Sequence, residues 1–510
     1  MTNVSLIALT AALVAALGGV TAPVTAEPET PASGPQPGHE VMMVDLRRAP
    51  FDKQLAFTTL QGQVNQGRPK LFVVLNDANP KWVDSLEAYG HFELVETSPS
   101  KAMRELLPQV GRQVIADQDR PWTISLATTI AGLENAVVSL EDLGVETVFD
   151  TRGRWETKAE GYAWAMEHLM PRVNLDALAF LDTGLPNLRD WIVSDRLMTI
   201  DLDPINDEAE IALLDRILEK YPAMTPVLGW PSDKYADEAK GQNNVTVEHA
   251  LVDRLSRRDM LLVPADYADN ISVLRELPTP EQLHQHIADE VVFDPEKRYI
   301  TLILSDGDNM QYDLNRMRDL WVDPGMHQFP LGWTTSPQWA DVAPAVMEIY
   351  YRESAARGGK QEFVTGPSGF AYAHPGSLTP NTLDQFVAET HRTSAALDLK
   401  SMVVLDHPRA PWQRTQRFLG VFAGEAIDAA WLAEYTDRRG IIKRSGGAEM
   451  AFLSESTRLD GSRATPAAVE VNRRAPDERF QMVYVDAWTI TGEVLADFER
   501  QLDDNIDIVA

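Results

Sequence analysis

The chain has 510 residues, a formal net charge of -30 at pH 7 and no cysteine. A chain of this length exceeds one ordinary hydrophobic core, so at least two domains are expected. The acidic charge argues against a nucleic-acid partner, since no basic stripe offsets the repulsion of phosphates. The lack of cysteine excludes disulfides, thiolate nucleophiles, cysteine-ligated zinc and a lipobox cysteine.

The first 40 residues have the pattern of an export signal followed by a linker. Leu6 to Val20 is apolar and too short to span a membrane comfortably, and Val24-Thr25-Ala26 resembles a cleavage site. Met1 to Ser5 lacks the usual positive charge, so an uncleaved anchor or a misassigned start is the alternative. We expect a signal peptide at 1–26, a flexible linker at 27–40, and a periplasmic or secreted mature protein that does not span the membrane.

Residues 41–275 alternate short β-branched runs with amphipathic helical stretches. Such alternation predicts βαβ units with parallel sheet, here as small Rossmann-like α/β subdomains. A helix is expected at 53–64. Strands are expected at 41–46, 71–75, 123–126, 147–150, 198–202 and 226–228.

Residues 290–510 form a second, more regular region. About eight β units in roughly two hundred residues favour an irregular (β/α) barrel, with a doubly wound open sheet as the alternative. Helices are expected at 310–320, 340–356, 382–397 and 492–502. Strands are expected at 299–304, 329–333, 362–365, 401–405, 418–422, 449–453, 481–485 and 505–509.

Acidic residues follow several strands of this second region. Because the carboxyl ends of parallel strands open on one face, we expect these residues to meet at one mouth. Glycoside hydrolysis requires two carboxyl groups that face each other across the scissile bond. Asp306 or Asp308 together with Asp406 or Asp486 would supply such a catalytic pair. Glu348 and Glu425 are the substitutes.

The segment Ser305-Asp306-Gly307-Asp308-Asn309 is the densest of these signals. No cofactor is predicted, although two carboxylates and an amide can also bind a divalent cation. The structural alternative is a turn in which Asp308 or Asn309 caps the helix at 310–320. One cap does not need two aspartates, so we favour a functional loop.

A second loop, Gly366 to Pro375, is rich in turn-forming and aromatic residues. Aromatic rings stack on the apolar faces of sugars, and Trp321, Trp333 and Trp339 suggest a further glycan platform. Core packing is the alternative for each ring. The candidate substrate-binding residues are Asn309, Trp333, Ser368, Phe370, Tyr372 and His374.

Several segments together resemble the GxGYxYP family, whose members are classed as putative glycoside hydrolases. Their sequences are similar to the family's LQGxVN, NLSV, SDGDN, PLGW and GPSG segments. They lie at Thr59–Asn65, Asn270–Val273, Ser305–Asn309, Pro330–Trp333 and Gly366–Gly369. The resemblance implies an exported protein with composite N-terminal α/β domains and a C-terminal domain that acts on carbohydrate.

The motif that names the family is altered in Gly369-Phe370-Ala371-Tyr372-Ala373-His374-Pro375. Ala371 stands where the family has its second glycine, and His374 stands where it has its second tyrosine. Two other functions therefore stay open. One is a metal-dependent, deacetylase-like reaction that uses Asp306 or Asp308 with His374 or His407. The other is glycan binding without catalysis. The sequence does not indicate the oligomeric state.

Overall fold

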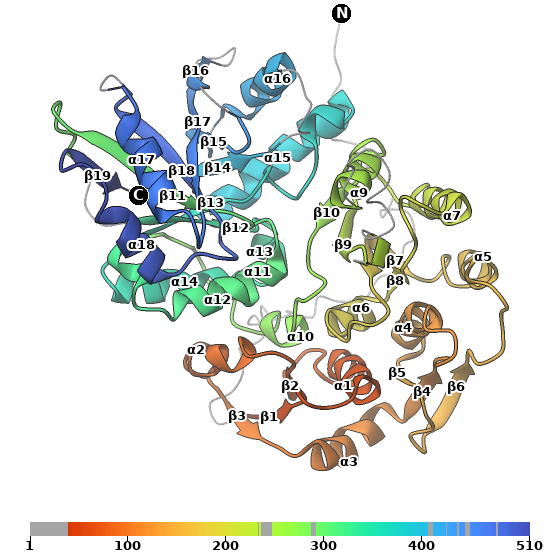
Figure 1. Cartoon of the computed structure of the whole chain (residues 1–510). Coiled ribbons are helices and arrows are strands. Elements are labelled where there is room, and N and C mark those ends of the chain that lie inside the picture. Colours follow the sequence, from red (N-terminus) through yellow and green to blue (C-terminus); the bar gives the residue numbers. More distant parts are fainter. Residues whose placement is uncertain are drawn as a thin grey trace, which may run out of the picture. The chain divides into compact units, whose positions relative to one another are not determined.

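The computed structural model describes residues 39–232, 234–235, 247–286, 292–405, 412–424, 426–435, 438–443, 449–475 and 478–509. The expected signal peptide lies outside these residues, as do Asp406, His407 and Glu425. In the described part, three small sheets precede a larger one (Figure 1). No helix among the described residues combines the length and apolarity that crossing a bilayer requires.

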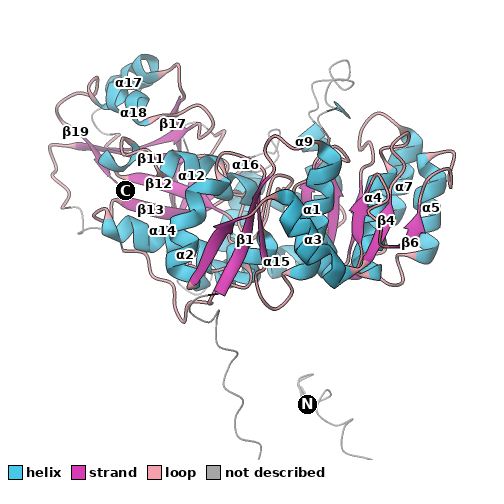
Figure 2. Cartoon of the chain, turned by 90° about the horizontal axis from the view of Figure 1, so that it is seen from below, coloured by secondary structure: helices cyan, strands magenta, loops and turns pink. Residues whose placement is uncertain are grey.

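The first subdomain is a small parallel sheet between helices. Its elements are β1 (His39–Asp45), α1 (Phe51–Val64), β2 (Leu71–Val74), η2 (Asn79–Trp82), α2 (Val83–Gly90), β3 (Phe92–Glu96) and α3 (Pro99–Val110). The strand order is β2-β1-β3. Alternate residues of a strand point to opposite faces, so Val44 and Val73 pack with α1 and α3, whereas Val41 and Phe72 pack with α2. Helices α1 and α3 thus share one face (Figure 2), and α2 covers the other.

The second subdomain is a three-stranded parallel sheet in the order β5-β4-β6. Its elements are β4 (Arg112–Ile115), α4 (Thr123–Glu134), β5 (Val137–Ser139), β6 (Glu146–Asp150) and α5 (Lys158–His168). The strand predicted at 123–126 is wrong, because these residues begin helix α4. The helix is buried almost all round, from Thr123 to Gly132, so its apolar residues do not show the one-sided helical period.

The third subdomain is a four-stranded parallel sheet in the order β10-β9-β7-β8. Its elements are β7 (Asn174–Leu181), α6 (Arg189–Asp195), β8 (Leu197–Ile200), α7 (Glu208–Leu218), β9 (Pro226–Trp230), α9 (Val247–Ser256), β10 (Leu261–Val263) and α10 (Ile271–Leu274).

A buried junction joins the first and third subdomains through segments far apart in sequence. Gln61 Nε2 donates to Asn270 Oδ1 at 2.6 Å. The same Asn270 side chain accepts from the backbone N–H of Val73 at 2.8 Å and donates to its carbonyl at 2.9 Å. Asn65 Nδ2 donates to Ser272 Oγ at 3.0 Å. The segments that resemble LQGxVN and NLSV therefore bind each other.

Asp269 lies at the same junction and is almost fully buried. Its carboxylate accepts hydrogen bonds from Asn187 at 2.6 Å and from Asn76 at 2.7 Å. Burial raises the pKa of Asp269 to about 7, although hydrogen bonds from Asn187 and Asn79 oppose the rise. Asn76 also donates to Asn315 at 3.0 Å, which links this junction to the C-terminal domain.

The C-terminal sheet closes into a parallel barrel. Its strands are β11 (Arg298–Leu304), β12 (Leu331–Thr335), β13 (Gln361–Thr365), β14 (Ser401–Val404), β15 (Ala429–Leu432), β16 (Arg439–Lys443), β17 (Glu449–Leu459), β18 (Phe480–Val485) and β19 (Ile506–Val509). The order β12-β13-β14-β15-β17-β18-β11 closes because β11 also pairs with β12. This seven-stranded ring confirms the predicted irregular barrel and rules out the open sheet. Strand β19 pairs with the first half of β11, and β16 pairs antiparallel with β17.

Helices follow most barrel strands, as the βαβ pattern predicts. They are α11 (Met310–Leu314), α12 (Arg316–Trp321), η3 (Met326–Gln328), α13 (Trp339–Val342), α14 (Ala345–Ala356), η4 (Pro375–Ser377), α15 (Pro380–Ala396), α16 (Trp412–Phe422), α17 (Ala464–Arg473) and α18 (Gly492–Glu499). A cluster of Ile303, Val364, Val403 and Met482, each from a different strand, fills the ring.

The strand predicted at 418–422 is wrong, because these residues end helix α16. The buried residues of α16 are Thr415, Phe418, Leu419 and Phe422, which is the i, i+3, i+4, i+7 spacing of a helix. The barrel strand at this point of the ring is instead β15, whose small alanines gave it a weak strand signal.

Candidate active site

The loop after β11 carries the two aspartates to the carboxyl end of the barrel. Gly307 is required here, since a Cβ on it would lie 1.9 Å from the carbonyl carbon of Thr334. Its N–H donates to Thr334 Oγ1 at 2.8 Å, and Asp306 adopts the left-handed conformation with φ of 69°. The loop is therefore folded tightly against the end of β12.

The second motif loop, after β13, packs backbone to backbone on the first. A Cβ on Gly366 would lie 2.5 Å from the backbone nitrogen of Asp308. The hydroxyl of Ser368 accepts from the N–H of Leu405 at 2.9 Å and donates to the carbonyl of the same residue. The glycines of these two loops thus allow an approach that any side chain would prevent.

A cavity of about 270 Å³ opens beside these loops. Among the described residues that line it, three are carboxylates, namely Glu248, Asp306 and Asp308. The other described lining residues are Trp230, Asn309, Gln311, Pro367, Tyr372, Leu405, Tyr484 and Trp488. Trp230 ends β9 and Glu248 lies in the first turn of α9, so the third subdomain supplies part of the wall. The site is therefore composite.

Glu248 is held in the cavity wall by the barrel. The hydroxyl of Tyr372 donates to Glu248 Oε1 at 2.6 Å. The backbone of Tyr372 also pairs with Leu262 of β10 through two hydrogen bonds of 2.9 Å. One residue of the second motif loop thus fixes both the backbone and a carboxylate of the third subdomain.

The environment of the two loop aspartates raises the pKa of both carboxyl groups. Burial raises the pKa of Asp308 well above its usual range, and the charges of Asp306 and Glu248 raise it further. Burial also raises the pKa of Asp306, but hydrogen bonds from Ser305 and Trp488 favour its charged form. Two carboxyls with such different surroundings can act as an acid and a charged partner.

The family models that match this chain cover most of it. They are the GxGYxYP second domain at residues 113–173, the third domain at 178–276, and the "GxGYxYP putative glycoside hydrolase C-terminal domain" at 296–510. The chain belongs to the GxGYxYP family. No curated protein sequence matches it.

The fold of this GxGYxYP chain is also that of a solved structure, a putative hydrolase from Bacteroides thetaiotaomicron. The TM-score is 0.79 at 19% sequence identity, and the match covers 93% of each chain. A polysaccharide deacetylase from Mycobacterium smegmatis, itself described as putative, has a TM-score of 0.31, 11% identity and coverage of 45% of this chain and 92% of that one. A 4-alpha-glucanotransferase from Thermococcus litoralis has a TM-score of 0.28 and 12% identity, and the match covers 42% of this chain and 39% of that one. These last two TM-scores are too low to carry an argument.

Some of the residues predicted from the sequence meet at the cavity. Asp306, Asp308, Asn309 and Tyr372 all line it. Asn309 precedes α11, and its side chain makes no capping hydrogen bond. The capping alternative for this loop is therefore not supported by Asn309.

Other predicted residues lie beside the cavity or elsewhere. Asp486 accepts from the N–H of Trp488 and from Thr489 Oγ1, both at 2.9 Å, so it holds the turn that carries Trp488. Phe370 packs on the core around the barrel. Glu348 lies on α14 in an ion pair with Arg352. Asp406 falls outside the described residues.

The tryptophan platform predicted from Trp321, Trp333 and Trp339 does not form, because all three rings are fully buried. Trp333 Nε1 donates to Gln361 at 2.6 Å, and its ring packs edge-on against Trp321. The tryptophans at the cavity are Trp230 and Trp488, and Trp488 is 49% exposed. Neither stood out in the sequence, since Trp230 is a single ring at the end of β9 and Trp488 is a single ring in the turn after β18.

Neither of the two altered residues of the GxGYxYP motif, Ala371 and His374, is among the described residues that line the cavity. Ala371 does not have a positive φ, so an alanine fits there without backbone strain. His374 is buried, and its backbone N–H donates to Ser256 Oγ at 2.9 Å.

Proposed function

We propose that this GxGYxYP protein is a glycoside hydrolase whose reaction takes place in the cavity between the barrel mouth and α9. The observation that supports it is the convergence of Glu248, Asp306 and Asp308 on one cavity with aromatic rings. Carboxyl groups in pairs and aromatic stacking surfaces are what glycoside hydrolysis uses.

Asp308 is the general acid of this proposal. Its raised pKa keeps a proton available at pH values where an ordinary aspartate has lost it. As the bond between the anomeric carbon and the leaving oxygen breaks, Asp308 transfers this proton to the leaving alcohol. The negative charge of Asp306 helps to keep Asp308 protonated. The carboxylate oxygens of Asp306 accept hydrogen bonds from sugar hydroxyls.

Glu248 is the second carboxylate. It comes from the third subdomain, whereas the acid comes from the barrel, so the two can act from different sides of a bound sugar. The hydrogen bond from the Tyr372 hydroxyl fixes the position of this carboxylate. Glu248 then acts as the base for the attacking water or as the nucleophile, and the anomeric configuration of the product distinguishes the two.

The leaving group provides the sharpest test. Asp308→Asn is expected to lose alkyl-glycoside hydrolysis by about a thousandfold or more, within the range of acid catalysis. A 2,4-dinitrophenyl glycoside needs no protonation of its leaving group, so the same variant should cleave it with a much smaller loss. The matched control is Asp319→Asn, which changes a half-buried carboxylate on α12 that pairs with Lys81. An Asp308→Asn enzyme that cleaves both substrates at the wild-type rate would overturn the proposal.

The metal-dependent alternative is separated by chelation. Hydrolysis that survives exhaustive treatment with EDTA excludes a cation at Asp306 and Asp308 as a participant.

The proposal extends to export, supported by the apolar segment Leu6 to Val20 and by Val24-Thr25-Ala26. Mass spectrometry of the protein recovered outside the cytoplasm should then give an N-terminus at Glu27.

A further inference from the structure

A second crevice lies on the first subdomain, at the carboxyl end of β1 and β2. The chain leaves β1 toward α1 on one face of the sheet and leaves β2 toward α2 on the other. In open α/β sheets, ligands bind where the connections from neighbouring parallel strands diverge in this way. The fold therefore forms a crevice of the kind that holds ligands.

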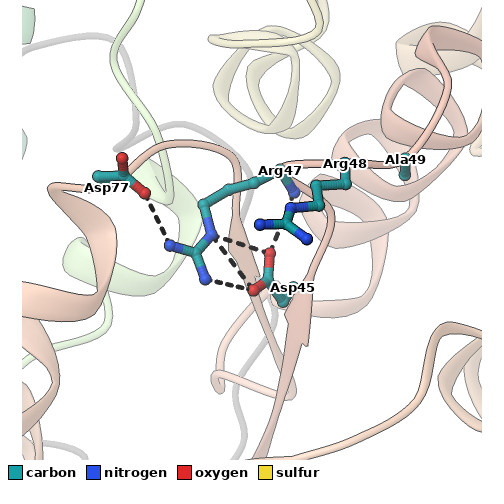
Figure 3. Close-up of a pocket in the computed structure, with 5 residues that line it drawn as sticks. All are labelled: Asp45, Arg47, Arg48, Ala49 and Asp77. Atoms are coloured by element: carbon teal, nitrogen blue, oxygen red, sulfur yellow. Dashed lines mark hydrogen bonds and ion pairs between the residues drawn. The ribbon is translucent and has the colours of Figure 1, made fainter.

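The crevice contains a cavity of about 670 Å³. The described residues that line it are Asp45, Arg47, Arg48, Ala49 and Asp77 (Figure 3). An adjoining cavity of about 450 Å³ shares Asp45 and Arg47 and continues past the end of β3 to Thr97 and Ser98. Each volume is within the range of about 300–1,000 Å³ that small-molecule sites occupy.

The guanidinium of Arg47 is held across the crevice by carboxylates from both strand ends. Its Nη1 donates to Asp77 Oδ1 at 2.7 Å, and its Nε donates to Asp45 Oδ1 at 3.1 Å (Figure 3). The hydrogen bonds from Arg47 lower the pKa of Asp45, so this carboxylate is charged. Ion pairs this exposed contribute little to stability, so folding alone gives little reason to build such an array.

The lining discriminates against an anion. Asp45 and Asp77 already neutralise Arg47. Helix α1 begins after Pro50 and has Asp52 in its first turn, and the connection from β1 lacks the glycine-rich turn that binds phosphate. A neutral polyhydroxylated ligand suits the lining better, because each hydroxyl can donate to a carboxylate or accept from a guanidinium.

We propose that this crevice binds a neutral oligosaccharide at a site separate from the cavity at the barrel mouth. No described residue lines both cavities. Asp45 and Asp77 accept hydrogen bonds from sugar hydroxyls. Arg48 is exposed on the loop after β1 and donates hydrogen bonds to other hydroxyls of the sugar. The first subdomain thus holds a glycan without cleaving it.

The test uses the full chain with Asp308→Asn, which blocks the proposed turnover, on an array of neutral gluco-, xylo-, manno- and galacto-oligosaccharides. The best ligand is then measured by calorimetry with Arg47→Met and with Asp77→Asn added separately. Each is expected to weaken binding by at least about tenfold, the effect of one charge-assisted hydrogen bond. Arg152→Met is the matched control, because Arg152 pairs with Asp150 at the end of β6 in the same way.

Binding that is lost in Arg47→Met and Asp77→Asn but kept in Arg152→Met supports the inference. No binding to the array, binding that all three variants keep, or preferential binding of inorganic phosphate or spermine would overturn it. The outcome is independent of the proposed hydrolysis. Arg47-dependent binding can occur in a protein without turnover, and turnover can occur without such binding.

Discussion

The hydroxyl of Tyr372 lies 2.6 Å from Glu248 Oε1 and donates a hydrogen bond to it, which joins the motif loop of the barrel to helix α9. The tyrosine of the family motif therefore contributes to the cavity chiefly by holding a carboxylate from another subdomain. A motif that looked like a substrate-contact loop in the sequence is also a device for positioning Glu248.

Tyr372→Phe removes this hydrogen bond and leaves the backbone pairing with Leu262 in place. We expect kcat for glycoside hydrolysis to fall by about ten- to a hundredfold, because Glu248 is no longer held, while the fold is retained. Tyr351→Phe is the control, since it removes a buried hydrogen bond to Leu397 away from the cavity. Equal kcat in the wild type and Tyr372→Phe would contradict the positioning role.

The pH profile reports the coupling between the two loop aspartates. The charge of Asp306 raises the pKa of Asp308, so Asp306→Asn should lower that pKa. The basic limb of kcat/KM, where the general acid loses its proton, should then move to lower pH. The residual activity of Asp306→Asn across pH measures this, and Asp319→Asn should leave the limb unmoved. A shift to higher pH would contradict the assignment of Asp308 as the acid.

The raised pKa of Asp269 makes stability depend on pH. Its folded pKa is about 7, and an unfolded aspartate titrates near about 3.9. Between these values the folded state binds more protons than the unfolded state. The contribution of Asp269 to the free energy of unfolding is therefore complete below about pH 4 and is lost as pH rises to about 7. The loss is on the order of 4 kcal/mol. Urea unfolding of wild type and Asp269→Asn at pH 5 and pH 8 checks it, because the variant should lose this part of the pH dependence. An unchanged dependence would show that Asp269 titrates normally.

Gly307→Ala tests the packing of the first motif loop on β12. The added methyl group would overlap the backbone of Thr334, so the loop must move, and we expect a loss of several kcal/mol in unfolding free energy together with the activity. Gly420→Ala is the control. It lies in helix α16, where the nearest atom to a new Cβ is 3.9 Å away, and it should be neutral or stabilising. Thermal unfolding of the two variants separates these outcomes.

Trp488 is the exposed ring at the cavity, so its replacement should affect binding more than folding. We expect Trp488→Ala to raise KM by about five- to a hundredfold, the range of one lost aromatic contact, with little change in Tm. Trp333→Ala, in the core, should instead destabilise the barrel by about 3–5 kcal/mol. A Trp488→Ala enzyme with unchanged KM would remove this ring from the substrate site.

The sequence predicts the barrel and its mouth because strand periodicity and the polar residues after each strand are local signals. Asp306 and Asp308 could be found in this way. Glu248 could not, since it lies in the first turn of a helix in another subdomain, which pairs with the barrel loop at Leu262 and Tyr372. The burial of Trp333 was equally hidden, because an indole that packs in a core and one that faces a sugar have the same local sequence.

The junction between Gln61 and Asn270 constrains the order in which the chain acquires structure. Strand β2 has the backbone groups of Val73 satisfied by the side chain of Asn270, which leaves the ribosome almost two hundred residues later. During synthesis, the backbone N–H and carbonyl of Val73 at the edge of the first subdomain's sheet therefore stay unpaired until Asn270 is made. An exposed strand edge can pair with other chains. A fragment that ends before residue 270 should therefore aggregate more than one that ends after α10.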